Sequence, residues 1–351
     1  MKIVGIGDLL IPKKYIEEAF NIFTEKGHIL KTVQWEINDY DKLQNINLNI
    51  EQNGANAIDP DDNIISEIED ADIIITQFFP VNKKVIDRCK NLKMVGVLRG
   101  GYENIDISYA SQKGILVYNT PGRNANAVAD FTIGMILSEV RNIARAHFEL
   151  KNGKWIKDYS NKGYIYDLTD KTIGLIGFGE IGKKVAKRLE AFDMNILFYD
   201  PYVKEYPDYV EKVELEELLA KSHFVSLHSR LSKDNKHVIN DRTLNLMRKD
   251  SYLINTARSG LVDEEALYKA LKEKRILGAA LDVFDKEPTG ANYPLIKLEN
   301  VTVTPHLAGG STDAFTNSPK LLAKELLDSL DNGESRFIVN RGWCYGFRFK
   351  R

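Results

Sequence analysis

The sequence predicts an α/β protein with two doubly wound parallel sheets, one in each of two domains. Short apolar runs alternate with amphipathic stretches along nearly the whole chain, which is the rhythm of β-α-β units. The length of 351 residues also favours two domains, because a typical domain has about 150 residues.

The first third of the chain contains four candidate strands. They are Ile3–Ile6, Ile73–Thr76, Met94–Val97 and Ile115–Tyr118. Helical patterns such as Asn82–Arg88 and Ile107–Gln112 lie between them, so the strands should form a parallel sheet covered on both faces. The segment Ile46–Asp62 is polar, and its structure stays open.

A long helical pattern then runs from Ala125 to about His147, with apolar residues at steps of three and four. The strong breaker Thr120-Pro121-Gly122 precedes it, which indicates a domain boundary. A last helix, around Ser318–Leu330, should return to the first domain, because chain ends tend to lie close together. We therefore predict one domain from residues 1–119 and 311–351, and a second from residues 120–310.

The second domain contains six further candidate strands. They are Thr172–Ile176, Ile196–Asp200, Phe224–His228, Tyr252–Asn255, Ala279–Val283 and Val301–Thr304. Six parallel strands with intervening helices match the size of a complete dinucleotide-binding (Rossmann) sheet.

A glycine motif after the first of these strands predicts the cofactor. Gly177, Gly179 and Gly182 follow an apolar strand and open a helix, and Asp200 stands 18 residues later at the next strand end. The glycines allow a tight turn, close approach of a pyrophosphate and close helix packing. Asp200 can accept hydrogen bonds from ribose hydroxyls and would repel a 2′-phosphate, so NAD is favoured over NADP. The alternative interpretation is that the glycines only form a turn and bind no ligand. It is disfavoured because the preceding strand, the following helix and the acidic residue Asp200 are all present.

Four polar residues follow later strands of the same predicted sheet: Arg258, Asp282, Glu287 and His306. Each has an ordinary structural interpretation when taken alone, but all emerge at the sheet edge where ligands bind. Arginine can hold a carboxylate with two hydrogen bonds, and histidine can protonate an oxygen. A nearby carboxylate raises the histidine pKa and fixes its tautomer. An arginine, a histidine and a carboxylate with these properties suit the reduction of a 2-oxo acid to a 2-hydroxy acid.

The composition of the chain excludes several classes of binding partner and site. The 48 basic and 50 acidic side chains give a net charge of −2, which argues against nucleic acid and against an anionic membrane. The two cysteines, Cys89 and Cys344, rule out a disulfide framework, and no His-x-x-His spacing predicts a metal site. No apolar run reaches the ~18 residues needed to span a bilayer. The first residues lack a signal-peptide pattern, so we expect a cytoplasmic protein. The basic tail Asn340–Arg351 is either a frayed terminus or an interaction element.

Six motifs together resemble the D-isomer-specific 2-hydroxyacid dehydrogenases, a family that includes D-3-phosphoglycerate dehydrogenase, glyoxylate reductase and D-lactate dehydrogenase. The motifs are Arg99–Asp106, Asn119–Asn124, Gly177–Gly182, Asn255–Arg258, Asp282–Pro288 and Thr304–His306. The resemblance implies a flavodoxin-like substrate domain and a Rossmann NAD-binding domain. It also implies a homodimer, formed through the long helix near Ala125–His147 and the loop beside it.

The resemblance assigns site residues as well. It implies that Arg258, Glu287 and His306 are the catalytic triad, and that Arg99, Gly100 and Gly101 hold the substrate carboxylate together with Arg258 and His306. It places Asp282 near the nicotinamide carboxamide. The full set that it implies for NAD is Gly177, Gly179, Glu180, Ile181, Gly182, Asp200, Ser229, Thr256, Ala257, Arg258, Asp282, His306 and Gly309.

Several alternatives stay open. The leading hypothesis is an NAD-dependent enzyme that acts on phosphoglycerate or a related sugar acid. Glu287 argues against the formate dehydrogenase branch, which resembles this chain but has Gln there. An NAD-sensing binding protein of the corepressor type would keep the same triad, and an NADP-dependent glyoxylate or hydroxypyruvate reductase is disfavoured by Asp200. Arg230 stands where the family often has Pro, and Gly100 where many members have Ala, so the substrate is left open.

Overall fold

The computed structural model describes residues 1–333 and 335–341, and the chain forms two compact units. Unit 1 comprises Met1–Arg123 and the described residues from Ser311 on, and unit 2 comprises Asn124–Gly310. The boundary therefore follows Arg123, not residue 119. The reason is bonding within unit 1, since the Thr120 N–H donates to the Arg99 carbonyl at 3.0 Å and Arg123 Nη1 donates to the Ala314 carbonyl at 3.3 Å. Residues 342–351 of the predicted basic tail lie outside the described residues, and Cys344 is one of them.

Unit 1 is built on a five-stranded parallel sheet with the strand order β2-β1-β3-β4-β5. The strands are β1 (Lys2–Gly7), β2 (Ile29–Gln34), β3 (Ile73–Thr76), β4 (Met94–Val97) and β5 (Leu116–Tyr118). The strand β2 was not among the predicted strands. It is an edge strand whose side chains are only partly buried, so its residues show no continuous apolar run.

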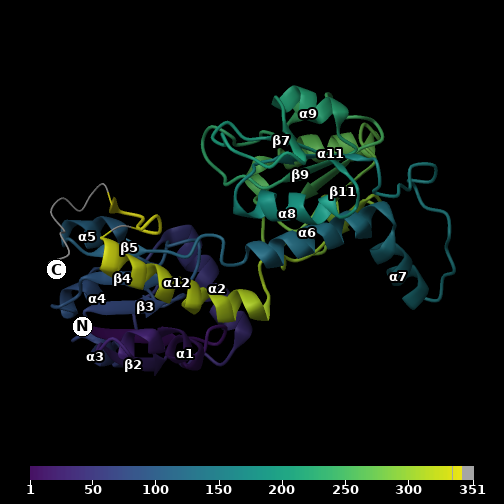
Figure 1. Cartoon of the computed structure of the whole chain (residues 1–351). Helices are drawn as coiled ribbons and strands as arrows, with labels where there is room; N and C mark the ends of the chain where they lie inside the picture. The colour runs from purple at the N-terminus through teal and green to yellow at the C-terminus, as the bar shows by residue number, and fades with distance from the viewer. Residues whose placement is uncertain (334, 342–351) are drawn as a thin grey trace. The chain divides into compact units, whose positions relative to one another are not determined.

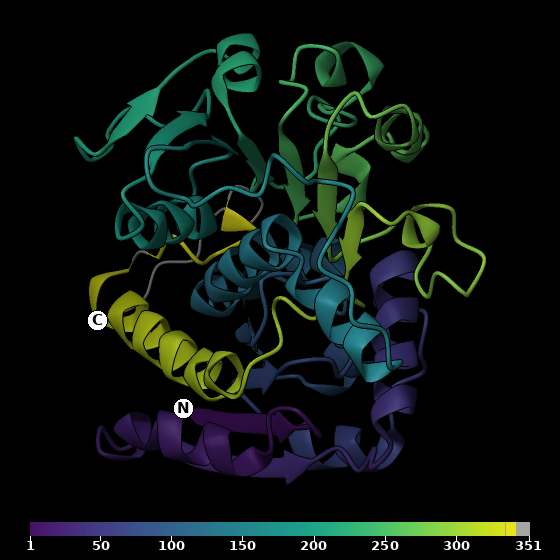
Figure 2. The ribbon, with the colours of Figure 1, turned by 90° about the vertical axis from the view of Figure 1, so that its right-hand side faces the viewer.

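Helices cover both faces of this sheet (Figures 1 and 2). They are α1 (Lys13–Thr24), α2 (Tyr40–Asn53), α3 (Asp62–Ile68), α4 (Lys83–Arg88), α5 (Ile107–Gln112) and α12 (Thr312–Asn332). The helix α12 returns from unit 2 as predicted and packs beside α1, where Leu322 and Leu326 enter the same core as Phe20. The ambiguous polar segment 46–62 forms the second half of α2 and the loop that follows it. The side chain of Asp39 caps α2 by accepting from the Lys42 N–H at 2.8 Å.

Unit 2 contains a seven-stranded parallel sheet with the order β12-β11-β10-β9-β6-β7-β8. The strands are β6 (Thr172–Ile176), β7 (Asn195–Tyr199), β8 (Val210–Lys212), β9 (Phe224–Leu227), β10 (Tyr252–Asn255), β11 (Gly278–Leu281) and β12 (Val301–Val303). The six predicted strands are present, and the short edge strand β8 was missed. The chain leaves β6 toward β7 on one side and later returns to β9 on the other, which creates a switch point between β6 and β9.

The helices of unit 2 form a layer on each face of its sheet, with α6 and α8 on one and α9 and α11 on the other (Figure 1). They are α6 (Ala125–Val140), α7 (Ile143–Lys151), α8 (Glu180–Glu190), α9 (Leu215–Lys221), α10 (Asp241–Leu244) and α11 (Glu264–Lys272). The prediction of one helix from Ala125 to His147 was wrong. The chain breaks at Asn142, whose φ of 56° is left-handed and whose amide donates to Asn161 Oδ1 at 2.8 Å.

In the part of the chain that the structure describes, no helix is both long and apolar enough to cross a bilayer.

Candidate active site

The candidate catalytic residues lie in unit 2, at the carboxyl ends of three neighbouring strands. The loop after β10 carries Arg258, the loop after β11 carries Asp282 and Glu287, and the loop after β12 carries His306. Because β10, β11 and β12 are parallel and adjacent, these loops meet at one edge of the sheet. A ligand bound to such a sheet is expected at this edge.

His306 and Glu287 form a direct pair. His306 Nδ1 lies 2.8 Å from Glu287 Oε2, and Glu287 Oε1 accepts from the Phe284 N–H at 2.9 Å. The carboxylate is thereby oriented, and it fixes Nδ1 as the nitrogen that faces the protein. The His306 side chain is about half exposed, at 49%, so its other nitrogen is open to a ligand.

This pair shifts both titrations in the direction that a proton donor needs. The hydrogen bond and charge of Glu287 raise the pKa of His306 above its ordinary value, although burial and Arg258 oppose the change. Burial alone would raise the pKa of Glu287. The hydrogen bonds from His306 and from the Phe284 backbone outweigh it, so the pKa of this carboxyl is lowered. The protonated imidazole beside an ionised carboxylate is therefore favoured toward neutral pH.

Asp282 builds the loop that presents His306. This buried carboxylate accepts from Thr304 Oγ1 at 2.5 Å, from the Leu307 N–H at 2.8 Å and from the Ala308 N–H at 2.9 Å. The His306 N–H donates to the Asp282 carbonyl at 2.9 Å. The loop thus holds His306 at a φ of 54°, a left-handed conformation that few residue types adopt freely. This anchoring role of Asp282 was not predicted from the sequence.

A second anchoring residue, Asn255, shapes the loop of Arg258. Asn255 Nδ2 donates to the Arg258 carbonyl at 2.9 Å, and Asn255 Oδ1 accepts from the Ala257 N–H at 3.0 Å. This role of Asn255 was not predicted, although the residue type indicates it, because asparagine side chains often form hydrogen bonds with the backbone two residues further on. The Arg258 side chain is exposed, and its charge lowers the pKa of both His306 and Glu287. The three residues of the predicted triad therefore lie within electrostatic reach of one another.

The glycine motif has the geometry that a dinucleotide needs. Gly177 has a φ of 98°, and a side chain there would come within 2.6 Å of the Ser229 nitrogen. A side chain at Gly182 would overlap the Gly177 carbonyl oxygen, whereas one at Gly179 would meet no atom within 4 Å. The space above Gly179 is thus open while the turn below it is tightly packed.

The N-terminus of α8 faces this open space. Gly179 is its N-cap and provides no side-chain cap, so the first N–H groups of the helix, at Glu180 and Ile181, can donate to an anion. Asp200 lies beside the motif, where its oxygens accept from the Phe178 and Tyr202 N–H groups, each at 2.9 Å. Those bonds leave lone pairs free for ribose hydroxyls. The residues present therefore fit the pyrophosphate and ribose of a nicotinamide dinucleotide.

The remaining predicted cofactor residues differ in what they can offer. Thr256 Oγ1 is buried and already has a partner in Thr132 Oγ1 at 2.8 Å, so its backbone is the more accessible part. Ser229 lies on the strand end that packs against Gly177, and its Oγ has one weak contact, with Asn235 at 3.5 Å. Gly309 approaches α6 so closely that a side chain there would come within 2.6 Å of Asn124 Nδ2.

In unit 1, the predicted substrate loop Arg99–Gly101 follows β4. The Arg99 guanidinium is buried and paired, since it donates to Glu51 at 2.8 Å and to Glu103 at 2.7 Å. The direct contact with a substrate carboxylate that the resemblance implied for this side chain would therefore have to displace a carboxylate of the protein. The Gly100 and Gly101 N–H groups have no acceptor among residues 1–333 and 335–341, so they remain available.

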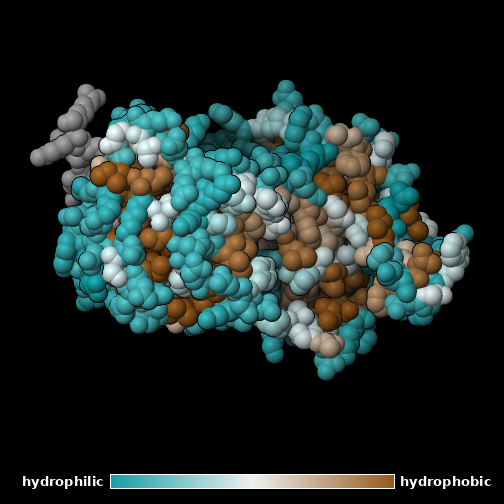
Figure 3. Space-filling view, turned by 90° about the horizontal axis from the view of Figure 1, so that it is seen from below, coloured by the Kyte–Doolittle hydropathy of each residue, from teal (hydrophilic) through white to brown (hydrophobic). Residues whose placement is uncertain are grey.

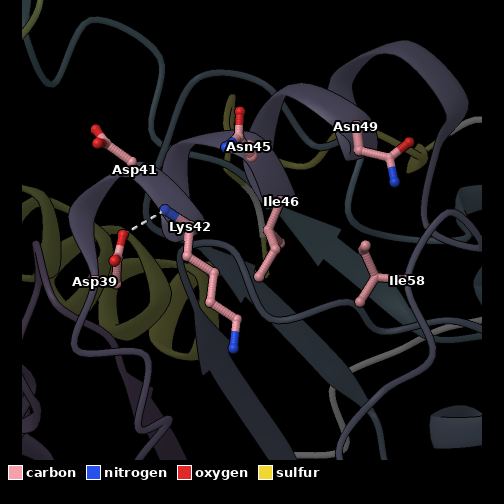
Figure 4. Close-up of a pocket in the computed structure, with 7 residues that line it drawn as sticks. All are labelled: Asp39, Asp41, Lys42, Asn45, Ile46, Asn49 and Ile58. Atoms are coloured by element: carbon pink, nitrogen blue, oxygen red, sulfur yellow. Dashed lines mark hydrogen bonds between the residues drawn. The ribbon is translucent and has the colours of Figure 1, made fainter.

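Other parts of the described chain offer less chemistry. We find no cluster of His, Cys, Asp or Glu side chains that could hold a metal ion in residues 1–333 and 335–341. Such a cluster would need three or more of these residues. A shallow pocket of about 500 Å³ lies along α2 (Figure 4), but it contains none of the predicted site residues. Its lining is Asp39, Asp41, Lys42, Asn45, Ile46, Asn49 and Ile58.

Comparison with known proteins supplies the family. Residues 133–308 match the model of the D-isomer specific 2-hydroxyacid dehydrogenase NAD-binding domain. The chain is 40% identical over 285 residues to a glyoxylate reductase of Thermofilum pendens, covering 79% of this chain and 84% of that protein. It is 39% identical over 282 residues to a D-3-phosphoglycerate dehydrogenase of Methanocaldococcus jannaschii, covering 79% of this chain and 53% of that protein. The chain thus spans about half the length of the latter relative.

A solved structure matches the fold of both units. It is a D-isomer specific 2-hydroxyacid dehydrogenase from Lactobacillus delbrueckii in its NAD-complexed form, with a TM-score of 0.75 at 23% identity over 97% of this chain and 100% of that chain. The domain match and the identity to full-length relatives agree with the motifs and with the two parallel sheets. The chain therefore belongs to the D-isomer-specific 2-hydroxyacid dehydrogenase family, and its unit 2 contains the family's NAD-binding domain.

Proposed function

We propose that this protein is an NAD-dependent oxidoreductase that interconverts a 2-oxo acid and the corresponding D-2-hydroxy acid. The observation that carries the proposal is the 2.8 Å pair of His306 and Glu287, within electrostatic reach of Arg258. The nicotinamide, when bound, supplies or accepts the hydride. In the reducing direction, protonated His306 donates a proton to the carbonyl oxygen, and Glu287 stabilises its charged form before that transfer. Arg258 holds the substrate carboxylate and polarises the carbonyl beside it.

The experiment that tests this function is the loss of NADH absorbance with a panel of 2-oxo acids, followed by chiral analysis of the product. Glyoxylate, pyruvate, hydroxypyruvate and 3-phosphohydroxypyruvate form a suitable panel. Turnover supports the proposal when the three acids other than glyoxylate, whose product glycolate is achiral, give the D-product. Binding of NADH without turnover of any acid would contradict it and favour the corepressor-like binding protein.

The preference for NAD over NADP is proposed from Asp200, whose carboxylate is fixed at the end of β7 by two backbone N–H groups. A 2′-phosphate beside it would meet a like charge. We expect kcat/KM for NADH to exceed that for NADPH, and we expect Asp200→Ser to narrow the difference by at least about tenfold. Parallel assays with the two cofactors measure this ratio. An equal ratio in wild type and variant would remove Asp200 as the determinant, and Asp208→Ser, on an exposed loop of the same unit, is the matched control.

Replacing Glu287 with glutamine is expected to move the pH profile of the reduction. The rate should fall as the pH rises through the pKa of His306, because only the protonated imidazole donates. Glu287 raises that pKa, so its loss should shift this basic limb to lower pH. The measurement is kcat/KM for the oxo acid between pH 5 and 10. An unchanged limb would show that another group titrates, and Glu265→Gln on α11 removes an exposed carboxylate as a control.

We also propose a homodimer formed through α7 and the segment after it. None of the α7 side chains is buried, and Phe148, Leu150 and Trp155 are 64%, 57% and 77% exposed. Figure 3 shows hydrophobic surface at this end of unit 2. The segment is nevertheless anchored, because buried Asn161 donates to the Val140 carbonyl at 3.2 Å and to the Tyr252 hydroxyl at 3.1 Å. An ordered apolar surface of this kind is typical of a subunit interface.

Phe148→Asp and Trp155→Asp should therefore convert a dimer into a monomer. Sedimentation equilibrium measures the change, because a buried aspartate without a partner opposes association. Tyr40→Asp, a 55% exposed aromatic at the start of α2, is the control and should leave the mass unchanged. A wild-type monomer, or a dimer that survives both substitutions, would rule out this interface.

A further inference from the structure

We infer that this enzyme prefers 2-oxo acids with an uncharged tail over phosphorylated ones, and that Glu51 on α2 enforces the preference by neutralising Arg99. The inference rests on the proposed function and extends it to the substrate class. It concerns a charge cluster in unit 1, defined here as Arg99, Glu51, Glu103, Arg123 and Asp8, that the proposed chemistry does not use.

Arg99 is occupied on every side that the structure describes. Nη2 donates to Glu51 Oε1 at 2.8 Å and to Glu103 Oε2 at 2.7 Å, and Nη1 donates to the side chain of Asn47. The guanidinium carbon lies 5.4 Å from the centre of the Phe78 ring. The Arg99 side chain is only 8% exposed. An incoming anion would have to displace one of the two carboxylates, so this arginine is poorly placed to bind a phosphate.

The ion pairs also hold the substrate loop in shape. The ion pair of Glu103 and Arg99 lies against Gly101. A side chain at Gly101 would overlap the Glu103 carboxylate and would come within 2.7 Å of Arg99 Nη2. On the other side, Asn119 Nδ2 donates to the Gly100 carbonyl at 2.6 Å. The loop is thus fixed by its side chains and carbonyls, which leaves the Gly100 and Gly101 N–H groups available to an anionic group.

The second guanidinium of the cluster, Arg123, stays protonated at neutral pH, and the nearby carboxylate of Asp8 partly compensates its charge. Arg123 is stacked 5.4 Å from the centre of the Phe315 ring and donates to the Ala314 carbonyl. Burial and the neighbouring Arg99 lower the pKa of Arg123 to about 10, and Asp8 opposes this change. Burial raises the pKa of Asp8 to about 6, so this carboxyl is still largely ionised at neutral pH.

The charges of the cluster therefore oppose a dianionic tail. Two guanidinium groups face three carboxylates at the edge where β1 and β4 end. A phosphate brought to this cluster meets a net negative charge, because its three carboxylates outnumber its two guanidinium groups, and like charges brought together in a protein site are strongly unfavourable. Glu51 is the member best suited to tune the effect, because it comes from a separate helix and is 43% exposed, so its substitution need not disturb the loop.

The test compares hydroxypyruvate with 3-phosphohydroxypyruvate, which differ only in the phosphate. For the wild type, we expect kcat/KM to be at least about tenfold higher for hydroxypyruvate. Glu51→Gln keeps the size of the side chain but removes its charge, so it should raise kcat/KM for the phosphorylated acid about tenfold through KM, with little effect on hydroxypyruvate. This gain should shrink in high salt, because screening weakens charge effects.

Two variants serve as controls. Glu51→Asp keeps the charge and should keep the wild-type preference. Glu67→Gln removes one carboxylate from α3, where it pairs with Lys31 outside the cluster, and should not change the ratio of the two substrates. Thermal melting of each variant shows that it is folded.

The outcomes separate this inference from the proposed function. If none of the four acids of the panel is turned over, the proposed function fails. If the wild type prefers the phosphorylated acid, or if Glu51→Gln changes both substrates equally, the enzyme assignment stands and the role of Glu51 is overturned.

Discussion

Replacing His306 with asparagine is expected to lower kcat for the reduction of a 2-oxo acid by about 10² to 10⁴, the usual contribution of a general acid. Asparagine cannot donate a proton in place of the imidazolium that Glu287 stabilises. It is chosen because it tolerates the left-handed conformation of position 306, where φ is 54°, better than alanine does. Steady-state kinetics measure kcat, and titration of NADH fluorescence should give a Kd that changes far less.

The matched control is His237→Asn. His237 also has a left-handed φ, of 53°, but it lies after β9 and makes no contact with the triad in the described chain. Its substitution changes the same residue type in the same backbone conformation and should leave kcat within about twofold, as is usual for a substitution away from a site. If kcat survives in His306→Asn, the proton donor is another group and the role given to His306 is wrong.

Replacing Arg258 with lysine is expected to raise KM for the oxo acid by about 10- to 100-fold, which is the value of one or two lost charge-assisted hydrogen bonds. Lysine keeps the charge but lacks the planar fork that fits a carboxylate. KM for NADH should change much less, because the contacts proposed for the cofactor lie mainly at the glycine motif, α8 and Asp200. Initial-rate measurements that vary each substrate in turn separate the two constants.

Equal effects of Arg258→Lys on both constants would indicate that Arg258 only shapes its loop. The structure gives that loop an independent support in Asn255, which bonds the backbone at positions 257 and 258. Arg242→Lys, an exposed arginine on α10, is the control and should alter neither constant.

The sequence alone predicted most of the fold because burial in a parallel sheet leaves a direct pattern. Strands that are covered on both faces, such as β3, β6 and β10, are continuous apolar runs, and their predicted bounds agree with the structure. The edge strands β2 and β8 are only partly buried, so their mixed composition hid them. The prediction of a single long helix from Ala125 to His147 was wrong, because nothing in the apolar periodicity of that segment indicates the left-handed turn at Asn142.

The candidate site also has features that the sequence predicts and features that only the tertiary structure shows. Glycine spacing and the acid at the next strand end depend on local backbone geometry, so the sequence was enough to predict a dinucleotide site. It was also enough to select Arg258, Glu287 and His306, since each follows a strand of the same sheet. What they do together depends on distances that local patterns do not contain. Only the tertiary structure pairs His306 with Glu287 and shows Asp282 holding their loop.

The clearest case is Arg99. As a sequence feature it is a cation in a loop next to two glycines, and the resemblance makes it a substrate contact. The tertiary structure gives it Glu51, from 48 residues earlier in the chain, as a partner. The sequence by itself determined the two sheets and the glycine motif, because these depend on local periodicity and spacing, and it predicted the candidate residues of the site. The tertiary structure decided which charges are neutralised, because an ion pair depends on which distant segments the fold brings within about 4 Å.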